Sequence, residues 1–515
     1  MIDLIIVISY FIIVMFLALR GKGGQDISQE EYFLSGRNLS WYSVAISTIA
    51  TNIQGYQFLG MMGSAYLYGL AQANLEINAI QGLLMAAFIF VPMYLRDQVV
   101  TITQWIQKRL GKTVGYLYSG SNILMFSTIG LGAALFWGAY AADIVFGEYF
   151  LFISDNPIYR ITVLIIGLGI FSAVYTYYGG LSAVVRTDII QFSILIIGGI
   201  ILLVVALRQI GGWNSLYEQT PELMHLHLPK DHATLPWIAI PGMLLLNINY
   251  WCANQVVMQR SLAAKSLRHA QAGLMVGGLM KYFMAILIII PGIALVSMLD
   301  TPLKDPDQTF PYLVKNFLSP GLRGIILCAL FASLMSTVDS LFNSLATLFS
   351  IDIYKGYMNP DATDAEVIHA GRMTILVTLV SGITMGIVLL YVKYNNPENA
   401  FTHTLNELRY YINCGIVILI ITAAFIWIKN KAWIIVAFLS SIPLQLIFKE
   451  VFPDMNYFVR AMWVIVIPLV VLGFSTLITG NQWTSEKKIK AADRKMGIAG
   501  WLLLISLIFI HLIFS

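Results

Sequence analysis

Apolar residues fill most of the chain in long runs separated by short polar stretches. A helix needs about 20 apolar residues to cross a bilayer, and runs of that length predict about fourteen transmembrane helices. We therefore expect an all-α polytopic membrane protein with one transmembrane domain over residues 1–515. The expected spans cover residues 2–20, 41–66, 73–95, 116–146, 159–178, 181–207, 235–256, 270–298, 320–350, 369–392, 401–427, 432–448, 457–478 and 497–514.

The composition agrees with this pattern. Hydrophobic residues make up 58% of the chain and charged residues 11%, whereas a soluble globular domain carries roughly 25% charged residues. The amphipathic segment Val99–Lys112 is too charged to span, so we expect it along the membrane surface. The cysteines Cys252, Cys328 and Cys414 lie in apolar runs and are expected to be small core residues.

Lysine and arginine residues gather in alternate loops, which predicts orientation in the membrane. One basic group is Arg260, Lys265 and Arg268, and another is the cluster from Lys487 to Lys495. With an even number of spans, both termini then lie on the extracytoplasmic side of the cell membrane. The net charge of +4 is accounted for by these loops and indicates no nucleic-acid partner.

The second expected span contains polar groups that hydrocarbon cannot satisfy. Within Ser47–Met61 these groups are Asn52, Gln54, Gly55 and Gln57. Unwound backbone at membrane depth occurs only where it is buried in protein or lines a watery cavity. We therefore expect a broken helix at a binding site. The alternative is an unbroken polar helix in which Gly55 and Gly60 let a neighbouring helix approach closely.

A second interrupted span is expected at Pro236–Trp251, where prolines and Gly242 precede a polar stretch. It follows the first by about five helices, the spacing of two inverted copies of one unit. Residues 41–207 and 235–427 would be the two repeats, and residues 1–40 and 428–515 would form peripheral helices. The alternative is that proline and glycine are simply common in membrane helices.

Ionisable residues inside spans are costly and point to function. They are Glu76, Asp188, Lys281, Asp339 and Glu407, with Arg409 one turn after the last. Glu76 and Lys281 are candidates for one ion pair, surrounded by the amides of Asn52, Gln57, Asn247 and Asn406. Many donors and acceptors without a net charge suit a neutral ligand with many hydroxyls. Tyr250 and Trp251 could stack on that ligand or close the path below it, or could simply pack.

The ninth span is dense in hydroxyl groups, at Ser333, Ser336, Thr337 and Ser340, next to Asp339. A desolvated alkali cation needs several oxygen ligands, and the free carbonyls of a broken helix can supply the rest. Carbonyls at Ala50 and Ile53 would complete such a site. The alternative is that these hydroxyls only bond neighbouring helices together.

Several motifs together resemble the sodium:solute symporter family, especially its sodium/sugar (galactose/glucose-type) branch. The resemblance is carried, in family order, by Ala50–Tyr66, Val174–Gln191, Asn249–Ser266 and Ser336–Ser344, leading into Ile351–Tyr354. It covers most of the chain. It implies a leucine-transporter-type core of five-plus-five inverted repeats that works by alternating access.

The resemblance also implies roles for residues at matching positions. The implied Na+ ligands are the carbonyls of Ala50, Ile53 and Ser333 and the hydroxyls of Ser336 and Thr337. The implied solute contacts are Asn52, Gln57, Glu76, Asn247, Lys281 and Asn406. Tyr250 is the implied inner gate, and Trp251 and Met61 are assigned to gating with it.

The sequence departs from the family pattern at several positions. Ser333 replaces a usual alanine, Asn406 stands where glutamine is frequent, and Leu75 occupies an often aromatic position. Leu408–Gly415 lacks the usual Ser-Pro-Gly. Asp339 is a carboxylate where a hydroxyl is common. Together with Asp188, Ser336 and Ser340 it could hold a second cation or a proton, or it could be neutralised by hydrogen bonds.

We therefore expect sodium-coupled uptake of a small neutral sugar or polyol. Another solute, such as a nucleoside, amino acid or sialic acid, is the nearest alternative, and a solute-binding membrane sensor is a more distant one. No nucleophile, base and orienting group form a set that would support an enzyme. The expected partners are sodium, the solute and the lipid bilayer; the sequence carries no signal for an oligomeric state.

Overall fold

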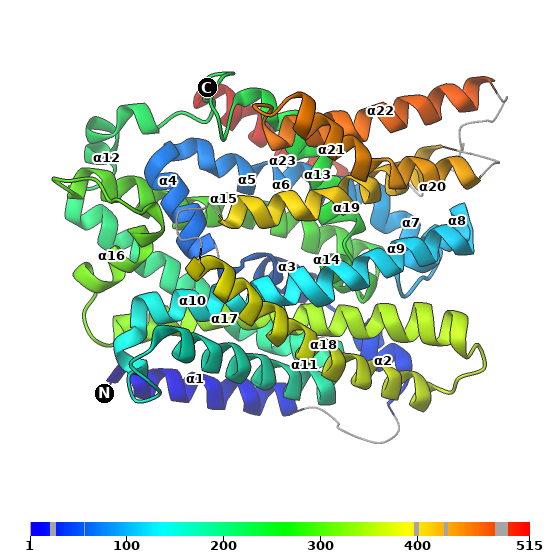
Figure 1. Cartoon of the computed structure of the whole chain (residues 1–515), viewed down its shortest axis with the longest axis horizontal. Helices are drawn as coiled ribbons and strands as arrows, with labels where there is room; N and C mark the ends of the chain where they lie inside the picture. The colour runs from blue at the N-terminus through cyan, green and yellow to red at the C-terminus, as the bar shows by residue number, and fades with distance from the viewer. Residues whose placement is uncertain (1, 21–26, 56, 396–400, 427–430, 479–492) are drawn as a thin grey trace.

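Helices make up nearly all of the chain, because a backbone in hydrocarbon must satisfy its polar groups internally. The computed structural model describes residues 2–20, 27–55, 57–395, 401–426, 431–478 and 493–515, apart from the side chains of 401–404, 406 and 476–478. Eleven helices within these residues are long and apolar enough to cross a membrane. Most helices run along one common direction, and both ends of the chain lie at the same end of the bundle (Figure 1).

In the part of the chain that the structure describes, each expected span coincides mainly with helix. The helices that lie within the expected spans are α1 (Ile2–Leu19), α3 (Trp41–Asn52), α4 (Met62–Tyr68), α5 (Asn74–Ile77), α6 (Ala79–Met85), α7 (Val91–Arg96), α9 (Lys112–Met125), α10 (Leu131–Phe146), α11 (Pro157–Ile210), α13 (Ile240–Ile248), α14 (Gln255–Leu262), α15 (Leu267–Met298), α17 (Leu322–Thr347), α18 (Asp364–Asn395), α19 (Phe401–Phe425), α20 (Lys431–Leu439), α21 (Ser441–Val451), α22 (Tyr457–Ile478) and α23 (Arg494–Ile513). Shorter helices outside the spans are α2 (Gln29–Leu34), α8 (Ile102–Leu110), α12 (Trp213–Gln219) and α16 (Thr309–Phe317). The amphipathic segment expected at the membrane surface contains α8.

Helix α11 is kinked and contains two expected spans, 159–178 and 181–207. They meet at Gly180, whose φ of 52° is open to glycine but strained for other residues. A Cβ atom at this position would lie 2.3 Å from the carbonyl oxygen of Tyr32. Glycine therefore permits both the change of backbone direction and the close contact with α2.

The break in the second span is confirmed. Helix α3 ends at Asn52, and Ile53 has extended backbone angles. The π-helical turn η2 (Gln57–Met61) then leads into α4. Gly55 also approaches a neighbour closely, because a Cβ atom there would lie 3.3 Å from the Cα atom of Gly138 on α10. The segment is therefore unwound, as the first hypothesis predicts, and Gly55 also allows the close helix contact that the alternative predicts.

The second interruption lies beyond the predicted range, so the prediction of Pro236–Trp251 was misplaced. Helix α13 continues into the π-helical turn η9 (Asn249–Ala253), and the extended residue is Asn254. Pro241 lies in the first turn of α13, where a missing N–H costs nothing. Asn254 makes the break because its side chain caps α14, accepting a hydrogen bond of 2.9 Å from the Val256 amide.

Packing places the broken helix at the centre of the bundle. Helix α3 packs against α15 on one side and against α11 and α17 on another, and α14 also contacts α3. The unwound segment after Asn52 therefore lies between helices that carry most of the ionisable residues. The inverted relation of residues 41–207 and 235–427 stays a prediction.

Candidate functional site

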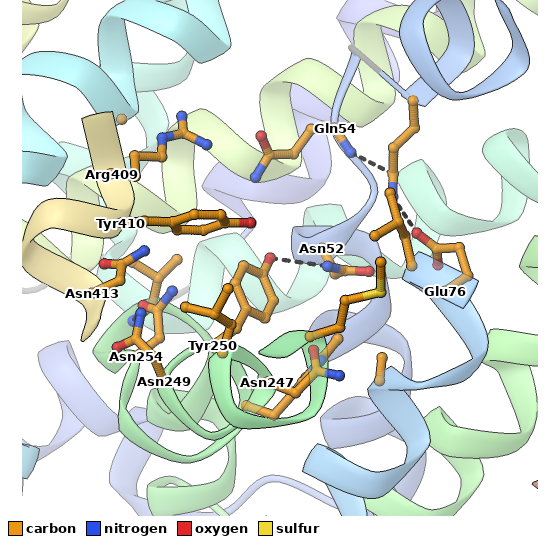
Figure 2. Close-up of a pocket in the computed structure, with 18 of the residues that line it drawn as sticks. Asn52, Gln54, Glu76, Asn247, Asn249, Tyr250, Asn254, Arg409, Tyr410 and Asn413 are labelled. Atoms are coloured by element: carbon orange, nitrogen blue, oxygen red, sulfur yellow. Dashed lines mark hydrogen bonds between the residues drawn. The ribbon is translucent and has the colours of Figure 1, made fainter. Parts of the chain in front are cut away.

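A cavity of about 230 Å³ lies beside the break in α3. It is lined by residues of α3, η2, α5, α13, η9, α15 and α19 (Figure 2). Of the expected solute contacts and gates, those that line it are Asn52, Gln57, Met61, Glu76, Asn247, Tyr250, Trp251 and Lys281. Asn406 lies on α19, but its side chain is outside the described residues.

Glu76 and Lys281 form the predicted ion pair. Lys281 Nζ lies 2.6 Å from Glu76 Oε2, and Gln57 Nε2 donates to the other carboxylate oxygen at 2.7 Å. Lys281 also donates to Asn52 Oδ1. Glu76 is 3% exposed and Lys281 1% exposed. Because the opposite charges pair directly, this side of the cavity presents polar atoms with little net charge.

The aromatic residues of η9 adjoin this pair. Tyr250 accepts a hydrogen bond of 3.0 Å from Asn52 Nδ2, which ties η9 to the end of α3 (Figure 2). Lys281 Nζ lies 5.1 Å from the centre of the Trp251 ring, within the range of a cation–π contact. Asn247 Nδ2 donates to the Asn78 carbonyl at 2.9 Å. The polar groups on this side of the cavity are therefore linked by hydrogen bonds and a cation–π contact.

The end of α3 meets the hydroxyl groups of α17. Thr337 Oγ1 donates to the Thr51 carbonyl at 3.3 Å, and Ser333 Oγ donates to the Ile53 carbonyl at 2.8 Å. The expected ligand Ala50 is buried in the last turn of α3. Carbonyl and hydroxyl oxygens from the two helices converge here, a donor set that suits a hard cation. That the Ser333 carbonyl is a ligand stays a prediction. Its hydroxyl bonds the Ile53 carbonyl because that carbonyl has lost its helical partner.

Arg260 is the site residue that the sequence analysis missed. It was counted among loop charges, but its side chain is completely buried. Its guanidinium lies 3.7 Å from Asp188 Oδ2 and donates to Ser47 Oγ at 3.0 Å. It also donates to Ser340 Oγ. The residue lies near the end of α14, followed by Lys265 and Arg268, so its position alone suggested a loop.

Asp188 and Asp339 lie on either side of this guanidinium network. Ser336 Oγ donates to Asp188 Oδ1 at 2.5 Å, and Ser47 Oγ donates to the other oxygen. Asp339 accepts from Tyr175 OH at 2.6 Å and from Ser340 Oγ at 3.4 Å. A second cation at Asp188, Asp339 and Ser340 stays a prediction. Arg260 already brings one positive charge to two of these three residues.

Glu407 does not belong to the cavity. It lies 3.2 Å from Lys449 Nζ on α21 and pairs with Arg460 on α22. Its neighbour Arg409 does line the cavity. The cavity also contains Asn249, Asn254 and Asn413, which no functional hypothesis had included. The available signal was the presence of amides inside apolar spans, the same signal that identified Asn52.

Comparisons with known proteins identify the family. Residues 32–432 match the model of the sodium:solute symporter family. The sodium/glucose cotransporter of Vibrio parahaemolyticus is 29% identical over 551 aligned positions, covering 100% of this chain and 98% of that protein. The sodium/myo-inositol cotransporter 2 of Rattus norvegicus is 30% identical, covering 73% of this chain and 59% of that protein.

The fold is shared with a solved structure of a Na+-coupled sialic acid symporter in a substrate-bound outward-open state. The TM-score is 0.77 at 18% identity, covering 92% of this chain and 98% of the other. The leucine-transporter-type fold predicted from the sequence is thereby confirmed. The match to the family model spans most of the chain, including α3, α17 and all the expected solute contacts. The chain belongs to the sodium:solute symporter family and is a multi-pass membrane protein that couples solute transport to sodium.

Proposed function

We propose that the protein carries a small neutral sugar or polyol together with sodium into the cell by alternating access. The observation that carries this proposal is the closed hydrogen-bond network of Gln57, Glu76, Lys281 and Asn52 on the cavity wall. Its charges compensate each other, so a charged solute would gain little there. A hydroxyl both donates and accepts, and can therefore exchange bonds with carboxylate, ammonium and amide groups alike.

The names of the relatives support this substrate class. Glucose and myo-inositol are both neutral molecules with many hydroxyl groups, and they appear in the names of relatives from two organisms. In our proposal Asn52, Gln57, Glu76, Asn247, Lys281 and Asn406 bind the solute. The ring of Trp251 offers an apolar face to the C–H side of a sugar, and Tyr250 closes the path below it.

Sodium binds, in this proposal, between α3 and α17. The ligands would be the carbonyls of Ala50, Ile53 and Ser333 and the hydroxyls of Ser336 and Thr337. The existing contacts from Thr337 to Thr51 and from Ser333 to Ile53 support this arrangement, because the required oxygens are already close. A cation at this contact would stabilise the broken end of α3, and thereby the solute residues Asn52 and Gln57 on either side of the break.

Coupling follows from this shared segment. Sodium and solute would both stabilise one conformation of the residues after Asn52, so each ligand would raise the affinity for the other by the same factor. Loss of sodium to a low-sodium interior would release the break and lower the affinity for the solute. In the proposed orientation, both termini face outward and the basic loops face the cytoplasm, as the lysine and arginine pattern predicts.

A sugar that carries a carboxylate is the second candidate. Arg409 lines the cavity, and Figure 2 shows its guanidinium above the ring of Tyr410, extending away from α19. The shared fold with a Na+-coupled sialic acid symporter is compatible with this candidate. The Glu76–Lys281 pair argues against it, because the lysine charge is already compensated.

Uptake into proteoliposomes tests the proposal. Purified protein would be supplied with radiolabelled glucose, galactose, myo-inositol, uridine, proline and N-acetylneuraminate under an inward sodium gradient, with potassium as control. We expect concentrative, sodium-dependent uptake of a neutral sugar or myo-inositol. Accumulation of N-acetylneuraminate alone would make the second candidate correct. Solute binding without accumulation under any gradient would favour a sensor.

A further inference from the structure

The polar residues that line the cavity form two sets, which we call lobes, and the sets differ in how many hydrogen-bond partners their side chains have. The ion-pair lobe contains Asn52, Gln57, Glu76, Asn247 and Lys281. The amide lobe contains Asn249, Asn254 and Asn413. Figure 2 shows the ring of Tyr250 between the two sets, with the three amides on its α19 side. Because both lobes line one cavity, a solute can pass from one to the other if Tyr250 moves.

Amide-lobe groups lack the partners that the ion-pair lobe has. Asn249 is 7% exposed, and its side-chain amide makes no hydrogen bond within the described part of the chain. Asn413 Oδ1 is buried without a partner among the same residues. Asn254 uses its oxygen to cap α14, and no described residue bonds its Nδ2. Buried polar groups in native proteins are normally satisfied, so these amides call for a polar occupant of the cavity.

The amide lobe lies further along the transport path than the ion-pair lobe. Asn254 follows Asn247 along the same span, towards α14 and the loop at Ala264. Ala264 pairs with Leu39, so this loop lies at the same end of the bundle as the basic group around Arg37. In the proposed orientation that end is cytoplasmic. A solute leaving the ion-pair lobe for the cytoplasm would therefore meet the amides after Tyr250.

We infer that the amide lobe is a second, transient subsite that receives the solute after Tyr250 moves away from Asn52. This inference rests on the proposed function, because amides that both donate and accept suit hydroxyl groups. The solute would exchange its bonds to the ion-pair lobe for bonds to Asn249, Asn254 and Asn413. The subsite lowers the barrier to release, since a polyhydroxylated molecule is never stripped of all its hydrogen bonds at once.

The test separates the rate of transport from equilibrium binding. Asn249→Ala and Asn413→Ala would be reconstituted beside wild type, using labelled galactose, glucose, myo-inositol or N-acetylneuraminate, whichever wild type accumulates. We expect the maximal uptake rate to fall about fivefold, as for one lost hydrogen bond in the passage, while the sodium-loaded dissociation constant changes less than about twofold. Asn413→Ser should restore part of the rate. Asn122→Ala, which removes a buried amide on α9 that does not line the cavity, should leave both values unchanged.

Two results would overturn the inference. If both values stay at the wild-type level, the amide lobe holds only water. If the dissociation constant rises in proportion to the loss of rate, these amides belong to the binding site itself and there is no second subsite. Should Asn249→Ala disturb η9 and fail to fold, Asn413→Ala on α19 decides the matter. If wild type accumulates only N-acetylneuraminate, the proposed function is wrong, and that solute still tests the subsite.

Discussion

Two buried acid–base pairs lie on different sides of α3, and they are built differently. Glu76 and Lys281 meet at 2.6 Å on the wall of a cavity. Asp188 and Arg260 are 3.7 Å apart, with both side chains completely enclosed. Around the first pair are amides and a tyrosine that a solute can reach. Around the second are hydroxyl groups of α3 and α17, which leave no room for a solute.

The difference indicates that a buried ion pair can either bind a solute or hold helices together. A pair on a cavity wall can exchange hydrogen bonds with a solute without exposing an uncompensated charge. An enclosed pair instead holds helices together, since Arg260 on α14 binds Ser47 on α3 and Ser340 on α17. In our account the first pair recognises the solute, and the second secures the helices beside the sodium ligands. Removing one partner of either pair should therefore produce different defects.

The largest effect is expected for Glu76→Ala. The change leaves Lys281 buried without its partner, a loss of about 3–5 kcal/mol for a broken buried pair. In our account the carboxylate also accepts hydrogen bonds from the solute. Losing a bond to a charged group should weaken solute binding about 10- to 100-fold, measured as an equilibrium dissociation constant at saturating sodium. The matched control is Glu407→Ala, an acid paired with Lys449 and Arg460 away from the cavity. Wild-type affinity in Glu76→Ala would place the solute elsewhere.

Arg260→Gln is expected to lower the stability of the folded protein more than its affinity for the solute. Asp188 would keep hydroxyl donors but lose its cation, and thermal unfolding in detergent should reveal a destabilisation of about 3 kcal/mol. The double variant Asp188→Asn with Arg260→Gln should recover most of this loss, because no buried charge is left unpaired. Arg268→Gln, whose exposed guanidinium lies 3.9 Å from Asp493, serves as the control. If the single variant unfolds like wild type, the enclosed pair does not hold the helices.

The double change Ser336→Ala with Thr337→Ala should remove sodium dependence. Losing two expected oxygen ligands should lower sodium affinity by at least about 10- to 100-fold, the loss caused even by outer-shell changes at metal sites. The sodium concentration for half-maximal uptake measures this effect, and the yield of folded protein controls for expression. Unchanged sodium dependence would contradict the site between α3 and α17.

Ser333→Ala should have the smallest effect and the opposite sign on sodium. The serine hydroxyl occupies the Ile53 carbonyl at 2.8 Å, which in our account is also a sodium ligand. Its removal should cost about 1 kcal/mol of stability but free the carbonyl, raising sodium affinity about two- to fivefold. A tenfold decrease in sodium affinity, measured by the same titration, would instead make the hydroxyl itself a ligand.

The sequence predicted the positions of the transmembrane helices better than it predicted the contacts of charged residues near helix ends. Long apolar runs predicted the helices because the bilayer leaves the backbone few alternatives. Glu76 and Lys281 could be paired in advance because intramembrane charges need partners. Arg260 could not be recognised, because a buried arginine at a helix end and a loop arginine occupy similar positions in sequence. The second break was misplaced because prolines at the start of a helix resemble prolines that interrupt one.

The amides of η9 and α19 escaped prediction for a different reason. Asn249 and Asn413 are separated by most of the second expected repeat, so only the packing of α19 on η9 brings them to one cavity. Asn52 was recognised because Gln54, Gly55 and Gln57 follow it within five residues. Local clusters of polar residues can be read from a sequence, whereas clusters assembled from distant helices require the fold.

Reciprocal titration of sodium and solute tests the central claim most directly. The dissociation constant of the accumulated sugar or polyol would be measured across sodium concentrations, and that of sodium across solute concentrations, with purified wild type. Our account predicts that each ligand tightens the other by the same factor, since both stabilise the broken end of α3. Solute binding that does not depend on sodium would contradict the account, because the two regions would then not be coupled.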